Sequence, residues 1–149
     1  MAITQAIANS FKKELLDGDM SFKQTGGDTF KIALYISTAT LNSTTSNYIV
    51  GGEVGNTGQY AAGGGALVNL GTSMTAGVAR CDFADRSFTG VSLTARGALI
   101  YNTTAGVGTG TTDAVCILNF GADKTATSGT FTIQFPAPTS TAAILRISG

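Results

Sequence analysis

The chain has 149 residues, of which 43% are hydrophobic and 12% charged, with nine basic side chains balancing nine acidic ones. It is too apolar to be disordered and long enough to enclose one core, so we expect a single domain with a helix at about residues 4–17 and a β-domain at about residues 28–149. Zero net charge without a basic cluster argues against direct nucleic-acid binding, and no apolar run is long enough to span a bilayer.

The first predicted element is the N-terminal amphipathic helix. Ile7, Phe11 and Leu15 recur at every fourth residue, which places them on one face of a helix. Thr4 is the expected N-cap, and Gly18 is the expected end, because glycine readily adopts the left-handed conformation that terminates many helices. A helix this short is marginal alone, so we expect it to dock on its own domain or on a neighbouring chain.

The rest of the chain alternates apolar and polar side chains, which is typical of half-buried strands. The alternating segments are residues 30–36, 66–70, 79–83, 91–95, 99–101, 114–118, 131–135 and 143–147. About eight strands after one helix predict an antiparallel β-sandwich or jelly-roll-like fold. Cys81 and Cys116 fall inside these segments, and we expect them to be small buried hydrophobic residues rather than a disulfide.

Two segments rich in Ser, Thr, Asn and Gly predict loops. Residues 38–65 lack apolar periodicity, apart from a short strand expected at Tyr48–Val50. Loops longer than about a dozen residues are uncommon unless they bind something or pack on a neighbour, so this segment is a candidate contact region. Its residues Tyr48 and Tyr60 could stack on a sugar or pack in an interface. Residues 103–112 predict a second, flexible loop.

The sequence offers little for catalysis or metal binding, and we expect a protein that is not an enzyme and needs no cofactor. Histidine, which exchanges protons near neutral pH without perturbation, is absent. Asp82 and Asp85 form the closest carboxylate pair, but Asp85 and Arg86 are typical of a turn with an ion pair. Asp113 and Asp123 could join them at a calcium ion, although no Asp-x-Asp-x-Asp run supports this. Without His and with two Cys, we expect no zinc or haem site.

Five segments carry a resemblance to a known group of proteins. They are Met1–Leu16, Asp28–Tyr35, Leu93–Asn102, Asn119–Lys124 and Phe131–Pro136, to which Glu53-Val54 before a Gly-rich loop can be added. Over nearly the whole chain, these segments resemble small virion proteins of tailed phages, especially those of cyanobacteria and other aquatic bacteria. The resemblance implies a structural protein that resides in the virion. The first residues, Met1 to Gln5, form neither the basic nor the apolar region of a signal peptide, so we expect the protein to be made in the host cytoplasm.

Among virion components, a capsid decoration or cement protein fits the chain best. Its low charge leaves little repulsion between copies, and its helix and long loop can reach a neighbouring subunit. We therefore expect a homotrimer bound to the major capsid protein, with no direct nucleic-acid or membrane partner. The predicted assembly contacts are Ile7, Phe11 and Leu15 of the helix and Tyr48 and Tyr60 of the loop. The alternatives are a tail-fibre or receptor-binding protein that recognises a host glycan, and a tail or connector component.

Overall fold

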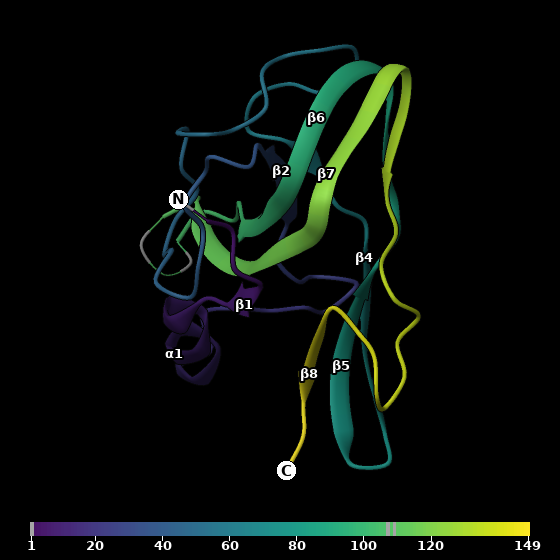
Figure 1. Ribbon diagram of the computed structural model, residues 1–149. Coiled ribbons are helices and arrows are strands. Elements are labelled where there is room, and N and C mark those ends of the chain that lie inside the picture. Colours follow the sequence, from purple (N-terminus) through teal and green to yellow (C-terminus); the bar gives the residue numbers. More distant parts are fainter. Residues whose placement is uncertain (1, 107, 109) are drawn as a thin grey trace.

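The computed structural model describes residues 2–106, 108 and 110–149. Its elements in chain order are β1 (Ala6–Ile7), α1 (Asn9–Asp17), β2 (Phe30–Tyr35), β3 (Gly65–Ala66), β4 (Asn69–Thr75), β5 (Val78–Phe83), β6 (Arg86–Asn102), β7 (Asp113–Ile133) and β8 (Leu145–Ile147). They form a five-stranded sheet in the order β1-β7-β6-β2-β3 and a three-stranded sheet in the order β4-β5-β8 (Figure 1). All strand pairs are antiparallel, which confirms the predicted mainly β, sandwich-like fold with an N-terminal helix.

The core lies around β2 and the parts of β6 and β7 that pair beside it. Consecutive residues such as Ala33, Leu34 and Tyr35 are fully buried, because both faces of the sheet are covered here. In the first half of β6 only alternate residues are buried, as expected for a strand with one face in solvent. The register between β2 and β6, from Phe30 opposite Asn102 to Tyr35 opposite Gly97, fixes the centre of the sheet.

The strands β6 and β7 are longer than the sequence predicted. Residues 91–95 and 99–101 were expected as separate strands, as were residues 114–118 and 131–135, and the structure joins each pair into one strand. The middle of β7 carries mostly exposed side chains, so it lacks the apolar alternation that identifies a strand. Cross-strand hydrogen bonds hold it instead, for example between the hydroxyls of Thr94 and Thr125 at 2.9 Å.

The two long strands bend together rather than remaining flat (Figure 1). Their register is interrupted between Phe88 and Val91, where Gly90 has a φ of 66° and Ser128 on the facing strand has a φ of 45°. A positive φ is rare for a residue with a side chain, and bulges of this kind sharpen the twist and bend of a strand pair. The bend allows the same two strands to extend from the five-stranded sheet toward the three-stranded one.

The helix α1 starts later than the predicted residue 4. Ala6 and Ile7 form β1 and pair with β7, and the N-cap is Ala8 rather than Thr4. Hydrogen bonds to the edge of a neighbouring strand compete with the first helical turn, and the sequence does not contain this information. The predicted end is confirmed, because Gly18 is left-handed with a φ of 82° and donates its N–H to the carbonyl oxygen of Leu15.

Three further predictions can be compared with the structure. Tyr48–Val50 is not a strand, and an isolated bridge joins the preceding residue Asn47 to Asp113. The predicted strand at residues 66–70 is divided between β3 and β4. Cys81 and Cys116 are buried and free, as expected. Positions 107 and 109 of the predicted second loop lie outside the described residues.

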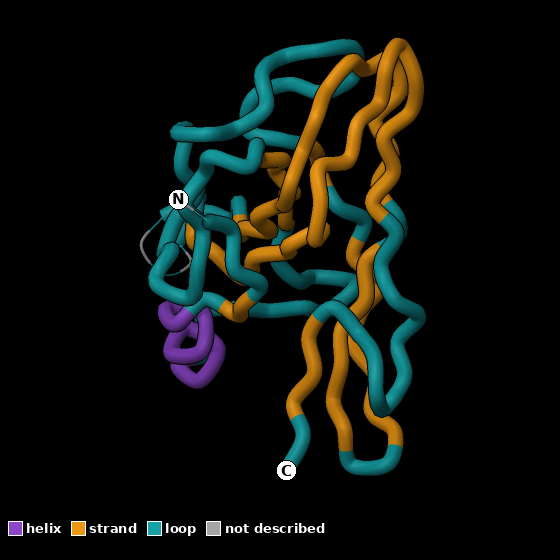
Figure 2. The backbone as a smooth tube through the Cα atoms, viewed as in Figure 1, coloured by secondary structure: helices purple, strands orange, loops and turns teal. Residues whose placement is uncertain are grey.

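The three-stranded sheet extends away from the rest of the chain, and we call it the arm (Figure 2). Its strand β8 lies on the side nearer to α1 (Figure 1). Within the part of the chain that the structure describes, no helix is long and apolar enough to cross a membrane.

Candidate assembly surface

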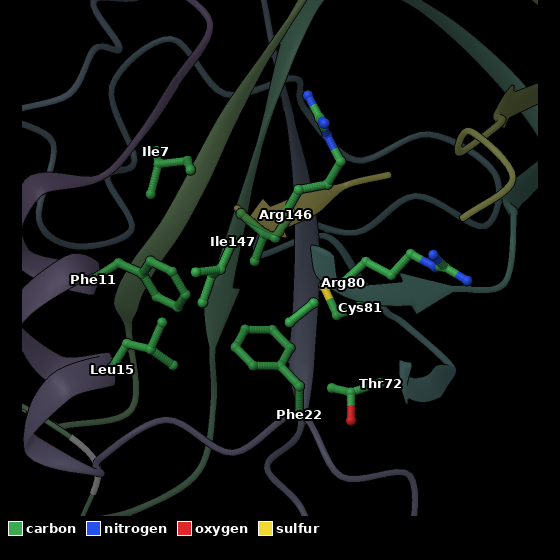
Figure 3. Close-up of a pocket in the computed structure, with 11 residues that line it drawn as sticks. Ile7, Phe11, Leu15, Phe22, Thr72, Arg80, Cys81, Arg146 and Ile147 are labelled. Carbon is green, nitrogen blue, oxygen red and sulfur yellow. The ribbon is translucent and has the colours of Figure 1, made fainter. Parts of the chain in front are cut away.

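An apolar cavity of about 150 Å³ opens between the arm and the N-terminal helix (Figure 3). Leu15 and Phe11 of α1 line one side of it, and Leu145 and Ile147 of β8 line the other. Phe11 packs edge to face on Phe22, with ring centroids 5.8 Å apart, so the deep part of the cavity is aromatic. This surface therefore belongs to two elements from opposite ends of the chain.

A second cavity of about 160 Å³ continues the first along β8. It is lined by Ile144, just before β8, and by residues of β1 and β7, and it shares Ile7 with the first cavity. We call the combined surface the β8 groove: one wall is residues 144–147, and the other is formed by Ile7, Phe11 and Leu15. Among the described residues β8 pairs with β5 alone, so its other side is a free edge of the three-stranded sheet.

The two faces of the arm differ in chemistry. Cys81 pairs with Leu145 and Ala79 with Ile147, and these side chains line the β8 groove. Leu145 is buried, whereas Ile147 is 60% exposed, so the outer part of this apolar face is uncovered.

Arg80 and Arg146 are direct partners in the register. Both residues border the groove, but their side chains leave the arm on the opposite face, since strand residues alternate between faces. Figure 3 shows their guanidinium groups directed away from the apolar side chains. Arg146 donates from Nη1 to the carbonyl oxygen of Ser140 at 3.0 Å, and Arg80 donates from Nη2 to Oγ1 of Thr75 at 2.9 Å. The ion pairs among the described residues are Lys13 with Asp17 and Arg96 with Asp123. The two arm arginines therefore have no carboxylate partner there.

A second group of interacting side chains lies under the long loop, where all four tyrosines of the chain gather around Glu53. Glu53 accepts hydrogen bonds at Oε1 from the Tyr60 hydroxyl at 2.8 Å and from the Gly63 N–H at 2.7 Å. Its Oε2 accepts one from the Tyr48 hydroxyl at 2.5 Å. The Tyr60 hydroxyl in turn accepts the N–H of Leu34 in β2 at 2.8 Å. We call this group the tyrosine cluster.

The remaining tyrosines tie further parts of the loop to the sheet. Tyr35 of β2 donates to the carbonyl oxygen of Ile49 at 2.7 Å, and Tyr101 of β6 donates to that of Gly63 at 2.5 Å. The rings of Tyr48 and Tyr101 stack with centroids 5.1 Å apart. Burial, reinforced by the Glu53 carboxylate, raises the pKa of Tyr35, as it does for the other tyrosines, so their hydroxyls remain neutral donors. The long loop is thus fixed on the sheet.

The predicted contact residues fall into two separate places. Ile7, Phe11 and Leu15 lie together in the β8 groove, and Tyr48 and Tyr60 lie in the tyrosine cluster. Phe11 is 4% exposed and Tyr60 1%, so nearly all contacts of these two side chains are made within their own chain. Ile7 and Leu15 are half-buried and partly accessible. Their role in assembly stays a prediction.

Sequence reasoning missed two features of these sites. It recognised the alternation at residues 143–147, but nothing in that alternation indicates that β8 is an edge strand beside α1. It also passed over Glu53 as the common acceptor of the loop, which only the meeting of Tyr48, Tyr60 and Gly63 reveals.

The predicted carboxylate groups have other partners. Asp85 accepts the N–H of Phe135 at 2.8 Å, and the Arg86 guanidinium lies 4.7 Å from the ring centroid of Phe88, so the ion pair predicted between Asp85 and Arg86 is wrong. Asp123 pairs with Arg96 on the exposed part of the long strands. Among the described residues, no three His, Cys, Asp or Glu side chains are grouped so as to hold a metal ion.

No protein-family model matches the chain, and no significant match was found among curated proteins or solved structures.

Proposed function

We propose that this chain is a non-enzymatic structural protein of a tailed-phage virion, where it acts as a capsid decoration protein that binds and stabilises the shell of major capsid protein. The observation that carries the proposal is the β8 groove, an apolar surface left open between α1 and the arm. Open apolar surfaces on folded chains are typical of protein interfaces. The sequence resemblance to phage virion proteins is the reason for proposing a virion as the assembly to which this surface binds.

The rigid loop supports the same role. Residues 36–64 are held on the sheet by the tyrosine cluster, so little conformational entropy is lost when this surface meets a partner. A pre-ordered loop and a pre-formed groove suit a protein that binds many equivalent sites on one shell.

Quantitative mass spectrometry of purified particles tests the role directly. A copy number comparable with that of the major capsid protein is expected for a decoration protein. A copy number far below it would favour a vertex, fibre or tail component, and absence from the particle would refute the virion role.

A matched pair of helix variants tests the surface. Leu15 is half-buried in the β8 groove, whereas its neighbour Leu16 is 89% exposed and outside the groove lining. Leu15→Asp should weaken cosedimentation with shells that lack this protein, because it places a charge in the apolar contact. Leu16→Asp should bind as the wild type does. Thermal melting confirms that both variants fold, and equal binding by the two would contradict the assignment of this surface.

A further inference from the structure

We propose that the β8 groove receives an extended strand from a partner protein, which adds to the arm beside β8 and carries apolar side chains toward the groove and carboxylates on the opposite face. The inference goes beyond the shell role, because it names the structural element and the chemistry of the partner. It holds for whichever assembly the chain joins.

The backbone of β8 provides the first argument. In the order β4-β5-β8, the strand β8 ends the sheet, and no backbone hydrogen bond of the described residues reaches its outer edge. The N–H and C=O groups along a free edge are the groups that a partner strand binds in β-strand addition. Leu145 and Ile147 of β8 line the groove from one face of the arm, so a strand added beside β8 extends this face and also covers apolar surface.

The two cavities define the groove-facing side chains of the partner. One cavity lies beside Ile144 and the other beside Leu145 and Ile147, so they follow the direction of β8. Successive residues of a strand point to opposite faces, and every second residue of the added strand therefore meets this apolar surface. Branched aliphatic residues such as valine suit these positions, since they pack well in strands and bury the exposed side of Ile147.

The arm arginines define the side chains on the other face. Arg146 lies beside Arg80 across the β5–β8 pair, and neither has an ion-pair partner among the described residues. Asp82, two residues along β5, is on the same face but forms no ion pair with either arginine. In antiparallel sheets an opposite charge directly across from Arg146 is favourable and a like charge is unfavourable. The partner strand therefore carries Asp or Glu at this position.

The same charges argue against a second copy of β8 as the partner. A twofold pairing of β8 with itself centred on its middle residue places two Arg146 side chains opposite each other. Such a pair is repulsive, and the strand is too short to shift its register without losing most of its contacts. An acidic, apolar segment of another protein fits the edge instead.

Two synthetic peptides test the inference on the intact chain. The first is Val-Glu-Val-Glu-Val-Glu-Val, and the second replaces each glutamate by lysine. Fluorescence anisotropy of the labelled peptides should show that the glutamate peptide binds about tenfold more tightly than the lysine peptide. A glutamate peptide with proline at alternate positions should not bind, because proline cannot donate to the free edge.

Charge reversal shows whether the preference arises at β8. Arg146→Glu should reverse the order of the two peptides, since Arg146 is exposed and its replacement leaves the apolar side chains of Leu145 and Ile147 in the groove unchanged. Lys124→Glu is the matched control, because it changes the net charge equally at an exposed position of β7 outside the arm. Ile147→Asp should weaken the binding of both peptides, while the melting temperatures of all variants verify the fold.

Several outcomes would overturn the inference: failure of both peptides to bind, equal binding of the two, or a preference that Arg146→Glu leaves unchanged. The shell role is tested separately by particle binding. Peptide binding by a chain absent from particles would refute the shell role alone, whereas particle binding that survives both Arg146→Glu and Ile147→Asp would refute the inference alone.

Discussion

Replacing Glu53 by alanine should release the long loop and destabilise the chain substantially. The carboxylate accepts hydrogen bonds from Tyr48, Tyr60 and the N–H of Gly63. Hydrogen bonds to a charged group each contribute about 1.5–3 kcal/mol. Without Glu53, the hydroxyl of Tyr48 and the N–H of Gly63 can bind water, because both residues are half-buried. Tyr60 is 1% exposed, so its hydroxyl cannot reach water unless the side chain moves. We therefore expect Glu53→Ala to lower the free energy of unfolding by about 3–5 kcal/mol.

Urea unfolding followed by circular dichroism measures this loss, and limited proteolysis reports whether residues 36–64 become cleavable. Tyr60→Phe is the graded comparison: it removes one bond to Glu53 and leaves the buried N–H of Leu34 without its acceptor, so it should cost about 1–3 kcal/mol. Asp123→Ala breaks an exposed ion pair and should cost less than about 1 kcal/mol. If Glu53→Ala unfolds within about 0.5 kcal/mol of the wild type and its loop resists protease, the tyrosine cluster does not hold the loop.

Burial raises the pKa of Cys81 and of Cys116 to about 12. Both thiols should therefore react with Ellman's reagent far more slowly in the native chain at neutral pH than in denaturant. Equal reaction rates in the two conditions would contradict their burial. Phe11→Ala removes the contact with Phe22 and should lower the free energy of unfolding by about 3–5 kcal/mol in urea titrations; a loss below about 1 kcal/mol would show that the helix is not anchored there. Burial, and to a smaller extent nearby carboxylates, raises the pKa of the Glu14 carboxyl. The folded chain therefore binds a proton at Glu14 more tightly than the unfolded chain does, and it loses stability as the pH rises through the pKa of Glu14 in the folded state. Glu14→Gln should therefore be more stable than the wild type at neutral pH, and the difference should shrink in acid; a pH-independent difference would refute this origin.

The sequence by itself determined the features that depend on neighbouring residues. Alternation at residues 30–36 and 79–83 identified β2 and β5, and Gly18 marked the end of the helix. The two cysteines were recognised as buried hydrophobic residues. These patterns are local, because a strand or a helix end imposes its periodicity or backbone conformation on a few consecutive residues.

Only the tertiary structure decided the features that depend on distant segments. Ala6 and Ile7 lie outside the helix because they pair with β7 instead. The exposed middle of β7 is a strand because β6 pairs with it. Glu53 becomes a common acceptor because the long loop returns to β2, and β8 becomes an open edge because the arm leaves it beside α1. These contacts join residues far apart in the chain, so their free energy leaves no periodic signal in the sequence around either partner.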